Sequence, residues 1–396
     1  MTAIRQGSAA TRRVVAVRAG LGVGAALLLA ACMPADAGTN GATGPRTSAA
    51  VINVGVHGSS WRPDRPIKVG VVAGTLEDVT VTAPDGSSVR GRTSRDGTHW
   101  VSTTKLLDFN KRYTVNVEAV DAAGLVTHRK RTFKTQKPKA LVHTSITPSS
   151  GTVGVGMPII VTYDAPVHNK AAAEQALDVT SLPAQPGGWY WVGDQMVRYR
   201  PKTYWEPGTK VTVTSHLAGV RLGKRVWGDD NDSATFDVGD SMISTVDIGN
   251  DTLTVRRNGE VIRTIPVTTG KPGWDTRLGI KVIMDKQPEV TMDAETIDVP
   301  KNSPDYYRLK VQWAMRLTWS GEYLHAAPWS VADQGHDNVS HGCTGMSTED
   351  AAWLYSVSKI GDVVDYVDGT RPWDPWNGYT DWNIPWSEWQ QGSALN

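Results

Sequence analysis

Two histidines and a cysteine lie close together near the C-terminal end of the chain. His325 is followed, after fourteen residues, by the run Ser340-His341-Gly342-Cys343. A thiol is a good nucleophile only as the thiolate, and a neighbouring imidazole can take its proton or pair with its charge. A glycine before the nucleophile lets the backbone approach closely, so that amide groups could face a developing oxyanion. The pattern therefore indicates acyl transfer through Cys343.

The cysteine content supports this interpretation. Cys32 and Cys343 are the only two cysteines in the chain. If Cys32 carries a lipid, as the N-terminal segment described below indicates, Cys343 is the single free thiol of an exported protein. Exported proteins usually pair or avoid their thiols, so a single thiol needs a chemical reason. A buried structural cysteine is the alternative, but the flanks His341-Gly342 and Thr344-Gly345 are not those of an apolar core. A nucleophile remains the favoured reading of Cys343.

Metal binding is a second alternative for this region. Four side chains there could ligate zinc: His325, His336, His341 and Cys343. None of them shows the Cys-x-x-Cys or His-x-x-x-His spacing of common zinc sites. We therefore expect no metal and no cofactor, and we expect His336 to lie in a loop.

The N-terminal segment has the features of an export signal. Arg5, Arg12, Arg13 and Arg18 precede an apolar run, Leu21 to Ala31, that is shorter than the ~20 residues of a membrane span. The run ends in Leu-Ala-Ala-Cys, which resembles a bacterial lipobox. We expect a lipoprotein signal peptide over 1–31 and lipid on Cys32, which would hold the protein at the outer face of the cytoplasmic membrane. Plain secretion is the alternative.

The sequence divides into segments that we expect to fold as separate units and to position these residues. A Gly-, Ala-, Ser- and Thr-rich stretch over 32–50 predicts a flexible tether. Short alternating runs with turn signals between them predict β-sandwiches over 51–139 and 140–240. A catalytic domain is expected over 241–370, and the Trp-rich tail 371–396 is expected to pack on the body because it carries too much aromatic surface for a disordered segment.

Two local predictions are sharp within the expected catalytic domain. The Asn258-Gly259 pair between two alternating runs predicts a β-hairpin. Ser347 can cap a helix running from Thr348 to Lys359.

The overall charge of the chain argues against a nucleic-acid partner. Lys and Arg number 41 against 40 Asp and Glu, which gives no overall basic excess for phosphate binding, so we expect no nucleic-acid partner.

The His325-to-Cys343 string resembles the signature of the L,D-transpeptidase catalytic domain. Other segments are also similar to that family, and in particular to its mycobacterial members: Gly151–Pro158, the region of Trp205, Thr269–Gly273 with Thr276 and Gly279, Asn302–Arg308 and Tyr323–Ser330. The resemblance covers nearly all of the mature chain. It implies a mainly β fold, with two immunoglobulin-like β-sandwich domains before a β-rich catalytic domain that has one or two helices.

The resemblance also implies a reaction and its residues. Cys343 would attack a tetrapeptide stem of peptidoglycan, expel the terminal D-alanine and pass the acyl group to a second stem as a 3→3 cross-link. Carbapenems would trap the same thiol. His325 would be the base, held by the carbonyl of Ala326, and His341 and Gly342 would shape the oxyanion hole. The implied substrate-binding residues are Met292, Tyr307, Ser320, Gly321, Trp329, Ser340 and Gly345.

Two departures from the family pattern stand out. Gly345 occupies a position where asparagine is more usual, so a side-chain amide contact is absent. Arg221 and Lys224 stand where some relatives carry calcium-binding acids; we expect no calcium there, and we expect Asp229–Asp232 to be a solvated turn. Hydrolysis of the acyl-enzyme, attachment of a lipoprotein to peptidoglycan, and a non-catalytic wall-binding module remain open alternatives.

Overall fold

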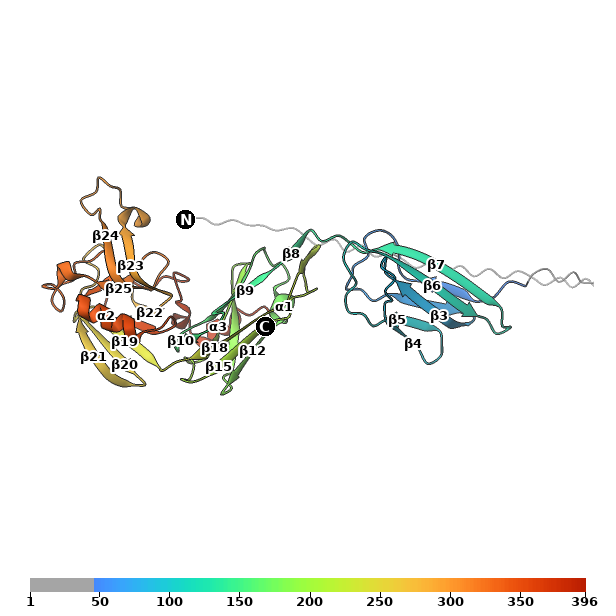
Figure 1. Ribbon diagram of the computed structural model, residues 1–396, viewed down its shortest axis with the longest axis horizontal. Coiled ribbons are helices and arrows are strands. Elements are labelled where there is room, and N and C mark those ends of the chain that lie inside the picture. Colours follow the sequence, from blue (N-terminus) through green and yellow to red (C-terminus); the bar gives the residue numbers. More distant parts are fainter. Residues whose placement is uncertain (1–45) are drawn as a thin grey trace, which may run out of the picture. The chain divides into compact units, whose positions relative to one another are not determined.

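A computed structural model describes residues 46–396, and its described part is mainly β, with three α-helices (Figure 1). The predicted signal peptide, Cys32 and most of the predicted tether lie outside the described residues. The strands of residues 46–396 form seven sheets, which gather around three hydrophobic cores.

The first core lies between two sheets, with strand orders β1-β2-β5-β4 and β3-β6-β7. β6 shows why these residues form strands: Tyr113, Val115, Val117 and Ala119 are buried, and the residues between them are not. This period of two is that of a strand with one face in the core. The strands are β1 Val51–Val54, β2 Lys68–Val72, β3 Thr75–Thr82, β4 Gly91–Thr93, β5 His99–Ser102, β6 Arg112–Val120 and β7 Val126–Lys134.

The second core lies between the sheets β10-β18-β15-β12 and β13-β14-β11-β9. A short helix, α1 (Lys170–Glu174), begins where the side chain of Asn169 accepts a hydrogen bond from the Ala172 amide. A small sheet adds β16 and β17 to β8. The strands are β8 Ala140–Val142, β9 Thr144–Thr147, β10 Thr152–Val153, β11 Ile159–Tyr163, β12 Leu177–Leu182, β13 Gly187–Val192, β14 Met196–Pro201, β15 Lys210–Ser215, β16 Arg221–Gly223, β17 Val226–Gly228 and β18 Asp232–Val238.

The third core is built around the sheets β21-β20-β19-β27-β22 and β23-β24-β25-β26. The β20–β21 hairpin confirms the turn prediction, because Asn258 and Gly259 both have positive φ, 50° and 89°. The elements are β19 Met242–Asp247, β20 Thr252–Arg257, β21 Glu260–Pro266, β22 Gly279–Val282, β23 Asp285–Asp293, η1 Ala294–Ile297, β24 Arg308–Arg316, β25 Tyr323–Ala326, η2 Pro328–Ser330, β26 Thr344–Met346 and β27 Val363–Val367.

The predicted helix is present as α2 (Thr348–Val357). The Ser347 side chain accepts a hydrogen bond from the Asp350 amide, as an N-cap does. The helix ends two residues before the predicted limit of Lys359, because Ser358 turns into an extended conformation with ψ 156°.

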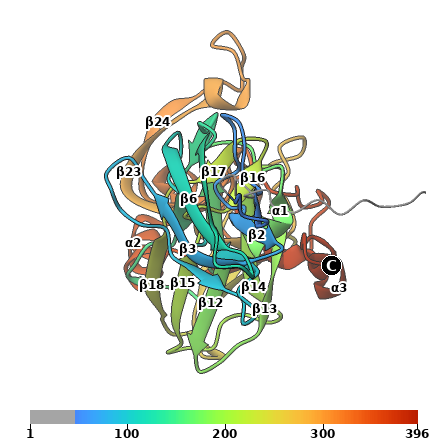
Figure 2. The same ribbon diagram turned by 90° about the vertical axis from the view of Figure 1, so that its right-hand side faces the viewer.

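The tail after residue 370 lies against the second sandwich. It contains a 3₁₀ turn, η3 (Asp381–Asn383), and the helix α3 (Trp386–Gln391), which Figure 2 shows next to β13. Arg198 on β14 makes a buried ion pair of 3.0 Å with Asp381. The guanidinium of Arg200 lies 4.5 to 5.3 Å from three tail rings: Trp382, Trp386 and Trp389. Cation–π contacts of this kind are strongest when desolvated, as here.

Replacing Trp389 by alanine is expected to destabilise the protein by about 3–5 kcal/mol, the range for removing a buried aromatic side chain. Trp389 is fully buried, and its indole N–H donates to the Gly188 carbonyl at 2.9 Å. Equilibrium unfolding in urea measures the effect. Gln390→Ala, an exposed neighbour on α3, is the matched control. A loss below about 1 kcal/mol for Trp389→Ala would show that the tail contributes little to stability.

Candidate active site

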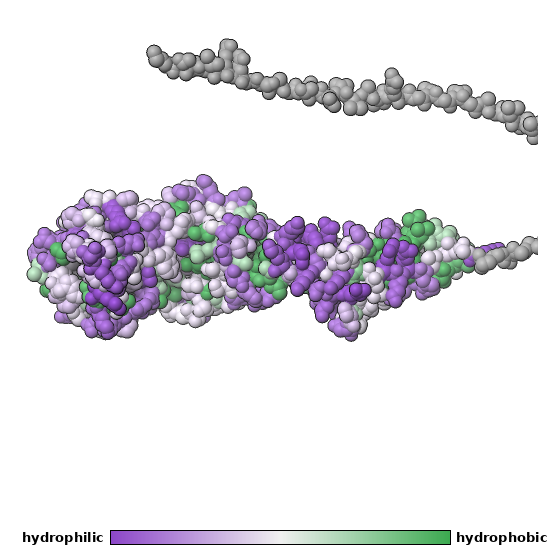
Figure 3. Space-filling model, turned by 90° about the horizontal axis from the view of Figure 1, so that it is seen from above, coloured by the Kyte–Doolittle hydropathy of each residue, from purple (hydrophilic) through white to green (hydrophobic). Residues whose placement is uncertain are grey.

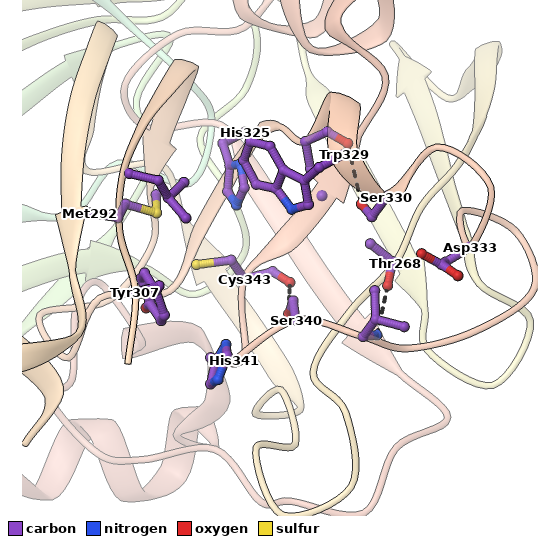
Figure 4. Close-up of a pocket in the computed structure, with 14 residues that line it drawn as sticks. Thr268, Met292, Tyr307, His325, Trp329, Ser330, Asp333, Ser340, His341 and Cys343 are labelled. Carbon is purple, nitrogen blue, oxygen red and sulfur yellow. Dashed lines mark hydrogen bonds between the residues drawn. The ribbon is translucent and has the colours of Figure 1, made fainter. Parts of the chain in front are cut away.

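One pocket of about 250 Å³ brings most of the predicted site residues together. Figure 4 shows His325 and Cys343 beside it, with Trp329 next to His325 and with Tyr307 and Met292 on a neighbouring segment. The predicted residues that line it are Met292, Tyr307, His325, Trp329, Ser340, His341, Cys343 and Gly345.

Ser320 and Gly321 line a second hollow, of about 190 Å³. Met292 and Tyr307 belong to both hollows and form a wall between them. These two residues come from the end of β23 and from the connection to β24, the hairpin labelled in Figure 1. The predicted substrate-binding residues therefore divide over two adjoining spaces.

Gly342 lines neither hollow but shapes the turn before the nucleophile. Its φ of 112° is a conformation that glycine adopts without strain. Its N–H donates to Ser340 Oγ at 3.0 Å, and Ser340 Oγ donates to the Cys343 carbonyl at 2.7 Å. The Gly342 N–H is thus already hydrogen-bonded within the turn. Gly342 therefore contributes to the expected oxyanion hole through the shape of the turn and not through its own N–H group.

His325 lies on β25, directly opposite Gly345 on the parallel strand β26. Its Nδ1 is 2.8 Å from the carbonyl oxygen of Ala326, which confirms the predicted backbone contact. Because a carbonyl only accepts, Nδ1 carries the proton and the lone pair of Nε2 is free. The strand thus presents the imidazole as a base. The Trp329 ring stacks on it at 6.0 Å.

Cys343 immediately precedes β26 and is 8% exposed. Its thiol donates to the Gly321 carbonyl at 3.5 Å. Burial raises the pKa of the Cys343 thiol to about 12, although a backbone hydrogen bond from Tyr323 and the charge of Lys281 oppose the shift. Burial likewise lowers the pKa of His325. Both groups are therefore neutral at pH 7, and the proton leaves the thiol as attack occurs.

The acylation rate is expected to be flat from about pH 6.5 to about pH 9. His325 acts as a base only when it is unprotonated, and its lowered pKa places the loss of rate below its ordinary value of 6.5. The thiol pKa of about 12 adds no ionisation in the neutral range. Stopped-flow measurement of carbapenem acylation against pH tests this. A tenfold rise between about pH 7 and about pH 9 would instead show a thiolate of ordinary pKa.

His341 lies on the other side of Cys343, between two aromatic rings. Trp274 and Tyr307 are 4.8 and 5.0 Å from it, centroid to centroid. Its Nε2 is 3.5 Å from Asp305, within ion-pair distance, but this nitrogen has no hydrogen-bond partner within residues 46–396. Asp305 instead accepts from Lys271 Nζ at 2.7 Å. Burial, then the charge of Lys271, lowers the pKa of His341, so this ring too is neutral.

A buried group of charges beneath the nucleophile was not predicted. Lys281 on β22 is 1% exposed, and its Nζ lies 2.7 Å from Glu322. Arg277 donates to the same carboxylate at 3.1 Å. Lys281 also lies 3.7 Å from the centre of the Tyr366 ring. Burial lowers the pKa of Lys281 while Glu322 opposes the shift. Two segments, residues 277–281 and the stretch before β25, thus place two cations and one anion behind the site.

Gly345 has a packing role that sequence reasoning missed. A Cβ at this position would lie 2.9 Å from the Ala327 Cβ and 3.2 Å from Thr268 Cγ2. The backbone of Gly345 exchanges hydrogen bonds with Thr268 on both sides, at 2.9 and 3.0 Å. This packing leaves little room for any side chain at position 345.

Several further lining residues also escaped prediction as site residues. Ala327 and Ser330 were part of a recognised segment, but nothing in the local sequence marked the others. They are Thr268, Leu309, Ala327, Ser330, Asp333 and Val339.

No group of three or more His, Cys, Asp or Glu that could hold a metal ion occurs in the part of the chain that the structure describes. Of the predicted turn, Asp229 and Asp230 lie 3.5 Å from the two ring nitrogens of His143. His336 is an exposed loop residue.

Family models match two parts of the chain. Residues 59–221 match a bacterial Ig domain. Residues 241–365 match the L,D-transpeptidase catalytic domain, and this range contains both hollows.

Characterised proteins are similar over much of the chain. L,D-transpeptidase 2 of Mycobacterium tuberculosis is 41% identical over 335 residues, which span 84% of this chain and 81% of that protein. L,D-transpeptidase 1 of the same species is 39% identical over 224 residues, 56% of this chain and 84% of that protein. The solved structure of the L,D-transpeptidase LdtMt1 in complex with imipenem has a TM-score of 0.50 and 39% identity, and covers 58% of this chain and 100% of that one.

Proposed function

The chain belongs to the L,D-transpeptidase family, and from this premise we propose that it cross-links peptidoglycan through a thioester formed on Cys343. Family and fold class both agree with the expectations drawn from the sequence. The observation that carries the proposed chemistry is the His325 ring, fixed by the Ala326 carbonyl in the tautomer that leaves Nε2 free beside the same pocket as the thiol.

The first half-reaction forms the acyl-enzyme. His325 Nε2 takes the Sγ proton as Sγ attacks the carbonyl carbon of the third stem residue, and the oxyanion forms near the His341-Gly342-Cys343 turn. The C–N bond to the terminal D-alanine then breaks, and His325 returns the proton to the departing amine. The result is a thioester on Cys343 and free D-alanine.

The second half-reaction uses a second stem. The side-chain amine of its diamino acid attacks the thioester, loses a proton to His325, and expels the thiolate, which takes that proton back. A 3→3 cross-link remains. Two adjoining hollows fit a reaction with two peptide substrates: we assign the donor to the hollow with Ser320 and Gly321, and the acceptor to the pocket with Trp329.

Incubation with a labelled tetrapeptide tests the transferase assignment. A cross-linked dimer with release of D-alanine is the expected product. Tripeptide alone would identify a hydrolase, and neither product would leave a wall-binding role. Carbapenem binding follows from the same thiol, and the relative solved with imipenem supports it.

Location at the membrane rests on Cys32, which lies outside the described residues. None of the helices in residues 46–396 is long and apolar enough to cross a membrane. We propose that a lipid on Cys32 holds the protein at the outer face of the cytoplasmic membrane, because the Leu-Ala-Ala-Cys run ends a secretory signal.

Cys32→Ser is expected to abolish both globomycin-sensitive processing and partitioning into the detergent phase. The serine hydroxyl cannot form the thioether to which the lipid is attached. Immunoblots of cell fractions measure both effects, with Cys343→Ser as the matched control that keeps the lipid. Persistence of detergent-phase partitioning in Cys32→Ser would exclude the anchor.

A further inference from the structure

The near-neutral charge of the whole chain hides a strong asymmetry. Residues 51–139 hold fifteen Lys and Arg against eight Asp and Glu, a net charge of +7. Residues 140–396 hold twenty-one against thirty-one, a net charge of −10. Such an asymmetry indicates a partner of opposite charge for the basic part.

The positive charges of the first sandwich are largely free. Among the described residues, Arg62 is the one Lys or Arg of this sandwich with a carboxylate partner, Asp64. Basic side chains concentrate on β7, where Arg129, Lys130 and Arg131 are consecutive and exposed. Nearby Glu118 lies 3.6 Å from His128, and it pairs with none of these three. The strand thus carries three uncompensated cations.

β7 is also placed to meet a surface. It lies at the end of the β3-β6-β7 order, so one side of it faces no neighbouring strand except at its last residue, Lys134, which is hydrogen-bonded to Gly58 and Trp61. Arg129 and Arg131 are opposite the core residues Val117 and Val115 of β6. Facing residues of paired strands share a side of the sheet, so these two side chains project on the opposite side from Lys130. Cationic side chains therefore project from both faces of β7.

The end of this sandwich at which the chain enters is apolar. The Ala49 amide is bound to Asp121, in the β6–β7 turn, at 2.8 Å. Three valines around this end are exposed: Val51 by 64%, Val72 by 70% and Val126 by 48%. A shallow hollow beside them is lined mainly by small residues, which are Ala49, Ala73, Gly74, Thr75, Val120, Asp121, Ala122 and Ala123. Figure 3 shows hydrophobic surface at this end, beside hydrophilic surface.

We propose that this end of the first sandwich docks on the anionic lipid surface of the membrane, with the valines among the headgroups and with β7 on the phosphates. Arg129 is three residues from Val126, or about 10 Å along the strand, which is close enough for its long side chain to reach lipid phosphates while the valines lie among the headgroups. Exposed apolar residues next to free cations match an anionic bilayer, whereas a soluble anionic polymer would use the cations alone.

The number of residues between Cys32 and the first sandwich agrees with docking on the membrane surface. Cys32 is sixteen residues before Ser48. The Gly-, Ala- and Thr-rich composition of residues 32–47 predicts an average span of about 22 Å, so a lipid on Cys32 would keep the sandwich close to the bilayer. The docking surface does not require the lipid, because its charges and valines belong to the folded domain.

Vesicle sedimentation of residues 46–396 tests the proposal. This fragment includes the compact unit Ser48–Asn396 and all three cores, so we expect it to fold without the leader. It is expected to sediment with vesicles of phosphatidylglycerol and phosphatidylcholine, and not with phosphatidylcholine alone. The triple variant R129Q/K130Q/R131Q is expected to bind roughly tenfold to a hundredfold more weakly.

A matched control separates local docking from overall charge. The variant K202Q/K224Q/R256Q loses the same charge from residues that have no ion-pair partner among the described residues, and it should bind as the parent does. The variant V72S/V126S should weaken binding to vesicles but not to soluble polyphosphate.

Three results would overturn the proposal. They are equal binding to neutral vesicles, equal weakening by the two charge variants, and vesicle binding that is insensitive to V72S/V126S. If V72S/V126S leaves vesicle binding unchanged and the protein also binds polyphosphate strongly, the surface would instead be one for an anionic wall polymer. Thermal unfolding of each variant shows that the fold is retained.

Discussion

Cys343→Ala is expected to lose all covalent capture of a carbapenem, while the parent protein gains the mass of one intact molecule. Opening of a β-lactam by Sγ expels no fragment, so the adduct keeps the whole inhibitor. Alanine has no nucleophilic atom, and the part of the chain that the structure describes contains no other cysteine. Mass spectrometry of residues 46–396 after exposure to imipenem measures the adduct, and the tetrapeptide assay should fall to background.

The control for this variant is Cys343→Ser, which keeps the turn and a weak nucleophile. It should fold as the parent does and react far more slowly, because a hydroxyl is a poorer nucleophile than a thiol under the same base. The Sγ contact with Gly321, at 3.5 Å, is weak, so neither substitution should cost much stability. An adduct that survives Cys343→Ala would place the nucleophile elsewhere and exclude the proposed mechanism.

His325→Gln is expected to slow acylation by about 10² to 10⁴-fold, the usual contribution of a general base. The thiol pKa of about 12 makes this dependence strong, because almost no thiolate exists at pH 7 without a base. Glutamine is close to histidine in size and neutral but has no basic nitrogen, so the packing around the strand should be largely retained. The fluorescence of Trp329, whose ring centre lies 6.0 Å from that of His325, offers a stopped-flow signal for the parent.

The pH dependence of the activity that remains in the His325→Gln variant is as informative as the size of the loss. Its acylation rate should rise steadily with pH, because only spontaneous ionisation of the thiol remains. His336→Gln is the matched control, since His336 is exposed in the loop between His325 and Cys343 and should leave the rate unchanged. A His325→Gln variant within threefold of the parent would mean that another group takes the proton.

Local patterns were predictable from the sequence. The Asn258-Gly259 turn and the Ser347 cap each depend on a few residues that are adjacent in the chain, whereas the Ala326 carbonyl contact was implied by the family resemblance. Turn and cap chemistry are local, so their residue types specify them directly. The motif around Cys343 was recognisable for the same reason, because its turn is closed by Ser340 only three residues away.

Long-range pairings were not predictable. Lys281 and Glu322 are far apart in sequence, and each taken alone is typical of an exposed surface. Their buried contact appears only when β22 and the segment before β25 are brought together. The same holds for Gly345: its lack of a side chain depends on the approach of Ala327 and Thr268, which no periodicity reveals. A single sequence contains no signal for these contacts.

The tail contacts make two distant parts of the chain depend on each other. Arg198 and Arg200 are separated from their partners Asp381 and Trp389 by more than 180 residues of sequence. Without the tail, two buried guanidinium groups and the surface of β13 would have no cover. We therefore expect the second sandwich and the tail to unfold together as one cooperative unit, although they are far apart in the sequence.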